Sequence, residues 1–128
     1  MMSIDFLNVE DVLELHANQV ALYGGDHGVR DLALLESAVA QAQATFGGEY
    51  LHTDIFEMAA AYLFHLVQNH PFLDGNKRAG AVAALVFLDI NQIEIDAPPG
   101  SIYELTLSVA TGQTGKAKIA EFFRSHAH

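Results

Sequence analysis

Hydrophobic residues recur every three to four positions along most of this chain, a spacing that predicts helices rather than strands. A first helix is predicted from Val9 to Tyr23, with Asn8 as its N-cap, and it ends at the glycine pair 24–25. A second is predicted from Asp31 to Thr45, and it ends at Gly47-Gly48. The residues expected to be buried on these two helices are Val9, Val12, Leu13, Leu15, Val20, Leu22, Leu32, Leu34, Leu35, Ala38, Val39 and Ala42.

Two further predicted helices are apolar almost all round, which is typical of helices at the centre of a fold. The first starts near Asp54, with Glu57 three residues later as its capping-box partner. It ends before Pro71, because proline cannot continue a helix and disfavours helix at His70. The second runs from Asn76 to about Asp89 and is rich in small residues. These two helices are therefore predicted to pack closely as an antiparallel hairpin.

The remaining segments are shorter. Residues 47–53 combine glycine with residues able to extend, which suggests a small flap, and residues 92–96 alternate like a short extended segment. A fifth helix is predicted from Ser101 to about Thr111, with Ser101 and Glu104 as a capping box, and a sixth from Gly115 to Ser125. The chain is therefore predicted to be all-α, with six helices around a central helical hairpin.

Composition fits one domain over residues 1–128, since 51% of the 128 residues are hydrophobic. No apolar run reaches the roughly 18–20 residues needed to cross a bilayer, and the first five residues do not resemble a signal peptide. Without cysteine there is neither a disulfide nor a thiolate metal site. These features predict a cytoplasmic protein with no membrane partner.

Charge is strongly acidic, with 6 basic against 16 acidic residues and a net charge of −10. This balance argues against direct nucleic-acid binding, which needs clustered Lys and Arg. Two of the few cations, Lys77 and Arg78, nevertheless stand side by side at the start of a central helix. There they oppose the helix dipole, an unfavourable placement that a bound anion would reverse.

The turn before these cations holds the candidate chemistry. In its neutral form, the imidazole of His70 can take a proton from a hydroxyl group. Asp74 offers the carboxylate oxygens that Mg²⁺ prefers. In isolation, however, a lone histidine is more often structural, and Asp-Gly-Asn-Lys is also an ordinary turn and helix start.

The sequence His-Pro-Phe-Leu-Asp-Gly-Asn-Lys-Arg at 70–78 resembles the signature of the Fic/Doc superfamily, His-x-Phe-x-(Asp/Glu)-(Gly/Ala)-Asn-(Gly/Lys)-Arg, at every fixed position. Residues 23–25, 28–31 and 35–38 are similar to the N-terminal part of its death-on-curing (Doc) branch. Fic proteins have glycine at the position of Lys77 and a second arginine at the position of Ala81. Both differences favour the Doc branch.

The resemblance implies a compact six-helix fold whose central hairpin carries the active-site loop. It also implies transfer of a group from ATP. Fic enzymes transfer AMP from ATP to a protein hydroxyl, whereas the Doc branch transfers the terminal phosphate. It therefore implies a toxin that uses ATP and Mg²⁺ to phosphorylate a Ser or Thr of a protein target, elongation factor Tu, and so arrests translation. It also implies a cognate antitoxin as a separate partner.

Site residues follow from the resemblance, position by position. The expected catalytic residues are His70 as the base, Asp74 as the Mg²⁺ ligand, and Lys77 and Arg78 against phosphate charge. The expected nucleotide site comprises Gly75, Asn76, Lys77, Arg78 and Gly80, with the Asn76 side-chain amide as a donor. Among the other side chains, Phe72 is expected to anchor the loop, His65 to be structural, Tyr23, Tyr62 and the phenylalanines to be core, and His126 and His128 to lie on a frayed end.

Two alternatives remain beside the kinase hypothesis. One keeps the site but transfers AMP, although Ala81 provides no second arginine. The other is a catalytically idle helical domain that only binds and regulates a partner. Residues 45–49 approach the inhibitory motif of many Fic proteins, but two glycines make a helix there unfavourable by about 1 kcal/mol each. Inhibition is therefore expected from the antitoxin.

Overall fold

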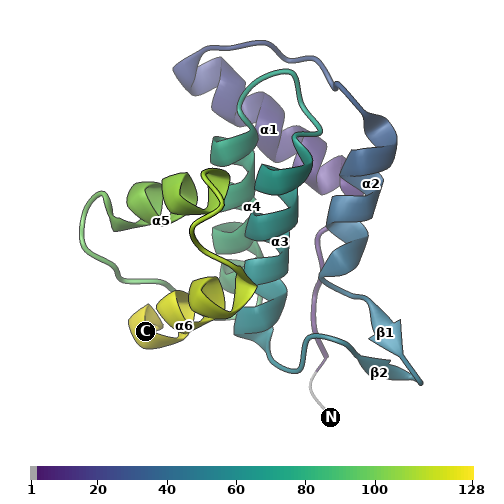
Figure 1. The fold of residues 1–128 in the computed structure, drawn as a ribbon, viewed down its shortest axis with the longest axis vertical. Helices are drawn as coiled ribbons and strands as arrows, with labels where there is room; N and C mark the ends of the chain where they lie inside the picture. The colour runs from purple at the N-terminus through teal and green to yellow at the C-terminus, as the bar shows by residue number, and fades with distance from the viewer. Residues whose placement is uncertain (1–2) are drawn as a thin grey trace.

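Helices dominate the structure, and the mainly-α fold is confirmed (Figure 1). The computed structural model describes residues 3–128; residues 1 and 2, where the expected signal-free N-terminal segment begins, lie outside the described part. The helices are α1 (Val9–Tyr23), α2 (Leu32–Gln41), α3 (Ile55–Asn69), α4 (Asn76–Ile90), α5 (Ser101–Ala110) and α6 (Lys116–His126). The strands β1 (Thr45–Phe46) and β2 (Glu49–Tyr50) form a small antiparallel hairpin. No helix within residues 3–128 is both long and apolar enough to cross a membrane.

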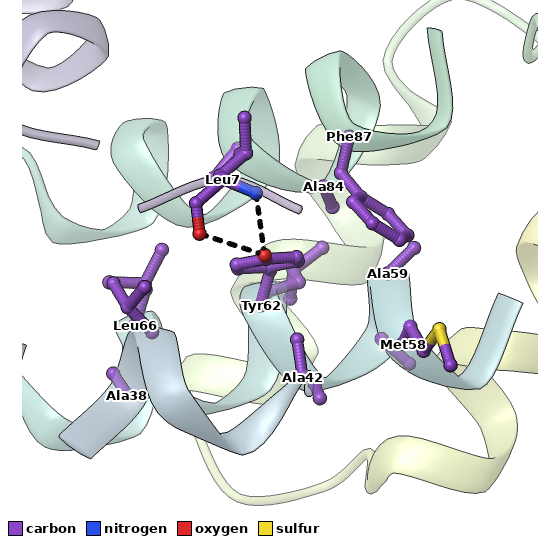
Figure 2. Close-up of a cluster of buried hydrophobic side chains, with 14 of the residues drawn as sticks. Leu7, Ala38, Ala42, Met58, Ala59, Tyr62, Leu66, Ala84 and Phe87 are labelled. Atoms are coloured by element: carbon purple, nitrogen blue, oxygen red, sulfur yellow. Dashed lines mark hydrogen bonds between the residues drawn. The ribbon is translucent and has the colours of Figure 1, made fainter. Parts of the chain in front are cut away.

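Helix α3 forms the centre of the fold, as its apolar sequence predicts. It packs against α2, α4, α5 and α6, and most of its side chains are buried. Figure 2 shows the Tyr62 hydroxyl directed at the backbone of Leu7 in the N-terminal segment. Its hydroxyl accepts a hydrogen bond from the Leu7 amide at 2.9 Å and donates one to the Leu7 carbonyl at 3.1 Å. Burial raises the pKa of Tyr62 to about 12, so the group remains a neutral donor.

Helices α3 and α4 pack closely because α4 has a glycine where they meet. A Cβ atom on Gly80 would lie 2.9 Å from Val67 Cγ2 and 3.1 Å from the Leu63 carbonyl oxygen. The two helices form the predicted antiparallel hairpin, and the loop that joins them lies beside α1 (Figure 1). The core of the fold therefore fixes both ends of the candidate active-site loop.

The boundary of α2 differs from the prediction. The helix ends at Gln41 rather than Thr45, and Thr45 belongs to β1. Gly47 and Gly48 both have positive φ, 61° and 85°, which suits the tight turn of a β-hairpin. The backbone of residues 45–46 is therefore hydrogen-bonded across the hairpin instead of along a helix, and the expected flap at 47–53 forms part of this hairpin.

Two predicted helix caps also differ. Helix α5 starts after Gly100, which has a φ of 82° and provides no side-chain cap, so the Ser101–Glu104 capping box is wrong. The Ser101 hydroxyl donates instead to a carbonyl of the preceding turn. At α3 only half of the predicted box forms: Asp54 accepts from the Glu57 amide at 2.8 Å, while the Glu57 carboxylate accepts from a neighbouring threonine hydroxyl.

Several apolar residues expected in the core are exposed. Leu22 and Tyr23 are each 71% exposed, Leu32 is 54% exposed, and Phe46 at the hairpin is 84% exposed. The first three lie at helix ends: Leu22 and Tyr23 are the last residues of α1, and Leu32 is the first residue of α2. Hydrophobic periodicity therefore overestimates burial at these positions.

The C-terminus is tied down rather than frayed. The predicted extended segment at 92–96 pairs with it, through a bridge between Ile95 and Ala127. The Asp96 amide donates to the His126 carbonyl at 2.9 Å, and the His128 amide donates to the Glu94 carbonyl at 2.8 Å. The expectation of a frayed end at His126 and His128 is therefore wrong.

Candidate active site

The candidate loop begins where α3 ends. His70 is the C-cap of the helix and has left-handed backbone angles, φ 48° and ψ 53°. For a residue other than glycine this conformation costs about 1 to 3 kcal/mol, so the surrounding structure must hold it. The imidazole is exposed to solvent. The structure thus places the predicted base at a strained, accessible turn.

Asn76 braces the loop from inside. Its Oδ1 accepts from the Phe72 amide at 2.9 Å, and its Nδ2 donates to the Phe72 carbonyl at 3.0 Å. The same Nδ2 lies 3.3 Å from Nδ1 of His70. The residue is only 8% exposed. Its side-chain amide is therefore engaged by the loop and orients the His70 ring, so the prediction that this amide donates to a phosphate is not supported by its position.

His16 on α1 supports the loop from the other side. Its ring stacks on Phe72, with centroids 3.7 Å apart and planes 4° apart, and both residues are buried. Nε2 lies 2.7 Å from the Asp74 carbonyl oxygen, and because a carbonyl can only accept, Nε2 carries the proton. Phe72 anchors the loop as predicted. Sequence reasoning missed His16, although its four-residue spacing from buried Val12 and Val20 marks it as a polar residue on the buried face.

Asp74 is exposed, and its carboxylate touches a glycine of the loop after α1. Oδ1 accepts from the Gly75 amide at 2.8 Å. A Cβ atom on Gly25, whose φ is 121°, would lie 2.6 Å from Oδ2 and 3.2 Å from an Arg78 guanidinium nitrogen. Only glycine allows the backbone this close to the carboxylate. Within residues 3–128, Asp74 makes no salt bridge.

The arrangement around Asp74 fits Mg²⁺ but not a metal held by the protein alone. Within the described chain, no group of three or more His, Asp or Glu side chains could hold a metal ion. Mg²⁺ is commonly bound through one or two carboxylates together with the phosphates of a nucleotide. The single carboxylate of Asp74, kept accessible beside Gly25, suits that mode of binding.

The N-terminus of α4 presents positive groups beside Asp74. Its N-cap is Gly75, with φ 77°, and no side chain caps the helix. The first amide bonded within the helix is that of Ala79, so the amides of residues 76–78 are free of helical partners. Lys77 is exposed, and Arg78 donates to the Gln19 carbonyl at 3.3 Å. Neither forms a salt bridge within residues 3–128, which leaves both charges available to an anion.

A cleft of about 760 Å³ opens at this helix end. Its lining residues come from α1, the loop, α4 and α5: Gln19, Tyr23, Asp74, Gly75, Asn76, Lys77, Arg78, Ala81, Val82, Ile102, Tyr103 and Thr106. Charged groups gather at one side, whereas Ala81, Val82 and α5 make the other side largely apolar. Tyr23, expected in the core, is instead exposed beside the cleft, and Tyr103 is 67% exposed.

Most predicted site residues lie together, but Gly80 does not. It faces α3 and serves the packing of the two central helices, away from the cleft lining. His65 lies at another contact, where its Nε2 is 3.0 Å from Lys116 Nζ on α6. Burial and then the Lys116 charge lower the pKa of His65 to about 4. Asp74, Gly75, Asn76, Lys77 and Arg78 line the cleft, whereas His70 begins the same loop outside that lining and contacts Asn76.

The chain is similar to known proteins over most of its length. The sequence model of the Fic/DOC family matches residues 6–88, which is more than half of the chain. The chain is similar to "Protein kinase doc" of Escherichia phage P1, with 32% identity over 118 residues that cover 92% of each chain. It is also similar to "Toxin Doc" of Mycolicibacterium smegmatis, with 43% identity over 93 residues, 73% of this chain and 69% of the relative.

Proposed function

The chain belongs to the Fic/DOC family, in its Doc branch, and from this premise we propose that it is a toxin kinase that phosphorylates a protein. The observation that carries the proposal is the uncapped N-terminus of α4, where Lys77 and Arg78 stand without salt bridges beside Asp74 within residues 3–128. This is a site for phosphate groups, and His70 lies at the opposite end of the same short loop.

The two sides of the cleft suggest how ATP would lie. Its phosphates match the charged side at residues 74–78, with the terminal phosphate nearest the loop. Its nucleoside matches the apolar side, where α5 contributes Ile102 and the exposed ring of Tyr103. Ala81 lies in the cleft lining with only a methyl group, at the position where Fic enzymes have their second arginine. This supports phosphate transfer over AMP transfer.

The proposed reaction moves one phosphoryl group and one proton. The oxygen of a Ser or Thr hydroxyl bonds to the terminal phosphorus, the bond from that phosphorus to the bridging oxygen breaks, and ADP leaves. His70 takes the hydroxyl proton at Nε2, so the neutral ring must carry its own proton on Nδ1. Nδ1 then cannot accept from the Asn76 amide, and the 3.3 Å contact between them must open. Lys77, Arg78 and the α4 amides stabilise charge on the transferred group. Mg²⁺, held by Asp74, would neutralise phosphate charge when bound.

The partners are proposed from the family. A relative named as a kinase and another named as a toxin support a cellular target and a cognate antitoxin. We propose elongation factor Tu as the target, in the cytoplasm, with no membrane or direct nucleic-acid partner.

The test is a mass spectrum of elongation factor Tu after incubation with this protein, ATP and Mg²⁺, with His70→Ala as the control. We expect a phosphate-sized gain that the variant abolishes. An AMP-sized gain would establish Fic chemistry instead. If elongation factor Tu gains nothing, the same assay on a cell lysate decides between another target and the idle binding domain, which would modify no protein.

A further inference from the structure

The segment between α1 and α2 is hydrogen-bonded to the start of the candidate loop. The amides of Arg30 and Asp31 both donate to the Pro71 carbonyl, at 2.7 and 3.0 Å. The Leu73 amide donates to the Gly28 carbonyl at 3.0 Å. These bonds hold the backbone on the C-terminal side of His70 against a segment about forty residues earlier in the chain.

The side chain of Arg30 holds the backbone at His70 itself and at the residue before it. Its Nε donates to the His70 carbonyl at 2.6 Å, and one terminal nitrogen donates to the Asn69 carbonyl at 2.9 Å. Both carbonyls lie at the C-terminal end of α3, where helical partners are missing and the helix dipole is negative. A guanidinium group satisfies both at once, because its donors form a planar fork.

We infer that Arg30 is a positioning residue that sets the place of His70 in the reaction. His70 has the unfavourable left-handed conformation, and Arg30 bonds directly to its carbonyl. Arg30 is not among the residues that line the cleft. It therefore acts on the proton acceptor and leaves nucleotide binding unchanged. The catalytic part of this inference rests on the proposed function.

Arg124 provides a matched control. It is another exposed arginine whose side chain makes two hydrogen bonds, to Asp54 Oδ2 at 2.7 Å and to Glu121 Oε2 at 3.0 Å. The bond to Asp54 joins α6 to the N-cap of α3, at the end of the helix opposite His70, and the bond to Glu121 lies within α6. Arg30→Ala and Arg124→Ala thus remove similar bonds from the surface, but only the first removes bonds to the loop.

The experiment compares both variants and Arg30→Lys with the unchanged protein in the transfer reaction. Misplacing a catalytic group by about 1 Å costs on the order of 10²-fold in rate. We expect Arg30→Ala to lower kcat roughly 10- to 100-fold with an unchanged KM for ATP. Arg30→Lys is expected to recover part of this loss, because its ammonium group can bond one of the two carbonyls. Arg124→Ala is expected to retain kcat. A kcat for Arg30→Ala equal to that of Arg124→Ala, or a loss confined to KM, would overturn the inference.

A second measurement separates this inference from the proposed function. Backbone carbon NMR shifts report whether His70 keeps its left-handed conformation, and they need no substrate. We expect them to change in Arg30→Ala and not in Arg124→Ala; shifts that stay left-handed would also overturn the inference. If the unchanged protein transfers nothing from ATP, the proposed function fails, and the His70 shifts still decide whether Arg30 positions the loop.

Discussion

Replacing Gly25 with alanine tests whether the approach of residues 24–25 to the carboxylate of Asp74 matters for the reaction. The new Cβ would lie 2.6 Å from Oδ2, whereas ordinary contact begins near 3.4 Å, so the two groups must separate by 3.4 − 2.6, about 0.8 Å. A displacement of that order at a catalytic group lowers the rate by about 10²-fold. Alanine at a φ of 121° is also strained, by about 1 to 3 kcal/mol, which a typical folding free energy of about 5 to 15 kcal/mol can absorb.

Gly24→Ala separates the backbone strain from the displacement of the Asp74 carboxylate. Its φ is also positive, 86°, but a Cβ there meets nothing within 4 Å. We expect Gly24→Ala to show the strain alone, with lower stability and a transfer rate within a few-fold of the unchanged protein. We expect Gly25→Ala to lower kcat/KM by about 10²-fold and to raise the Mg²⁺ concentration needed for half-maximal rate. Equal loss of activity in both variants, at matched folded fractions by circular dichroism, would refute the reasoning.

Three further predictions concern the cleft, the α3–α6 contact and the helix crossing. Tyr103→Ala is expected to raise the KM for ATP by about 5- to 160-fold, because base stacking on an aromatic ring contributes about 1–3 kcal/mol, whereas Tyr103→Phe keeps the ring and the KM. In the folded state His65 lies beside Lys116 and has a pKa of about 4, so the unfolded state takes up the proton first as the pH falls. The free energy of unfolding is therefore expected to fall by about 1–2 kcal/mol between pH 6.5 and pH 4, after allowance for the partial exposure of His65. Urea titrations of His65→Gln should lose part of that dependence, and an equal slope in both proteins would contradict it. Gly80→Ala is expected to lower the free energy of unfolding by about 1–3 kcal/mol in the same titrations, since its Cβ would lie 2.9 Å from Val67, and an unchanged midpoint would show that the crossing relaxes.

Sequence predicted the fold where local and overall preferences agree. Helical periodicity located all six helices, and the apolar character of α3 identified it as the central one. Periodicity failed at the ends of elements. The end of α2 depends on pairing across the hairpin, and Tyr23 is exposed in the lining of the cleft between helices, which no local pattern encodes.

The candidate site was predicted through its residue types, and its supports were not. His70, Asp74, Lys77 and Arg78 lie within nine residues of one another, so one motif found them. Asn76 fitted the motif as a donor to phosphate, but the turn after Pro71 buries it and uses its amide to hold Phe72.

The residues that hold this loop come from distant parts of the chain. His16 precedes the Asp74 carbonyl that it bonds by 58 positions, and Arg30 precedes the His70 carbonyl by 40. Gly25 approaches the Asp74 carboxylate only because α1 packs beside α4. Contacts of this kind arise from the tertiary packing, so hydrophobic spacing marks His16 as buried on α1 but does not indicate which loop atoms these residues contact.

The most direct measurement of the central claim is a pair of reactions on a cell lysate, one with ATP labelled at the terminal phosphate and one with ATP labelled at the α-phosphate. Protein-bound label is separated on a gel, and His70→Ala provides the background. Label above that background is expected to enter protein from the terminal phosphate alone. Label from the α-phosphate, or equal labelling by the variant, would contradict the assignment of this cleft as a phosphotransferase site.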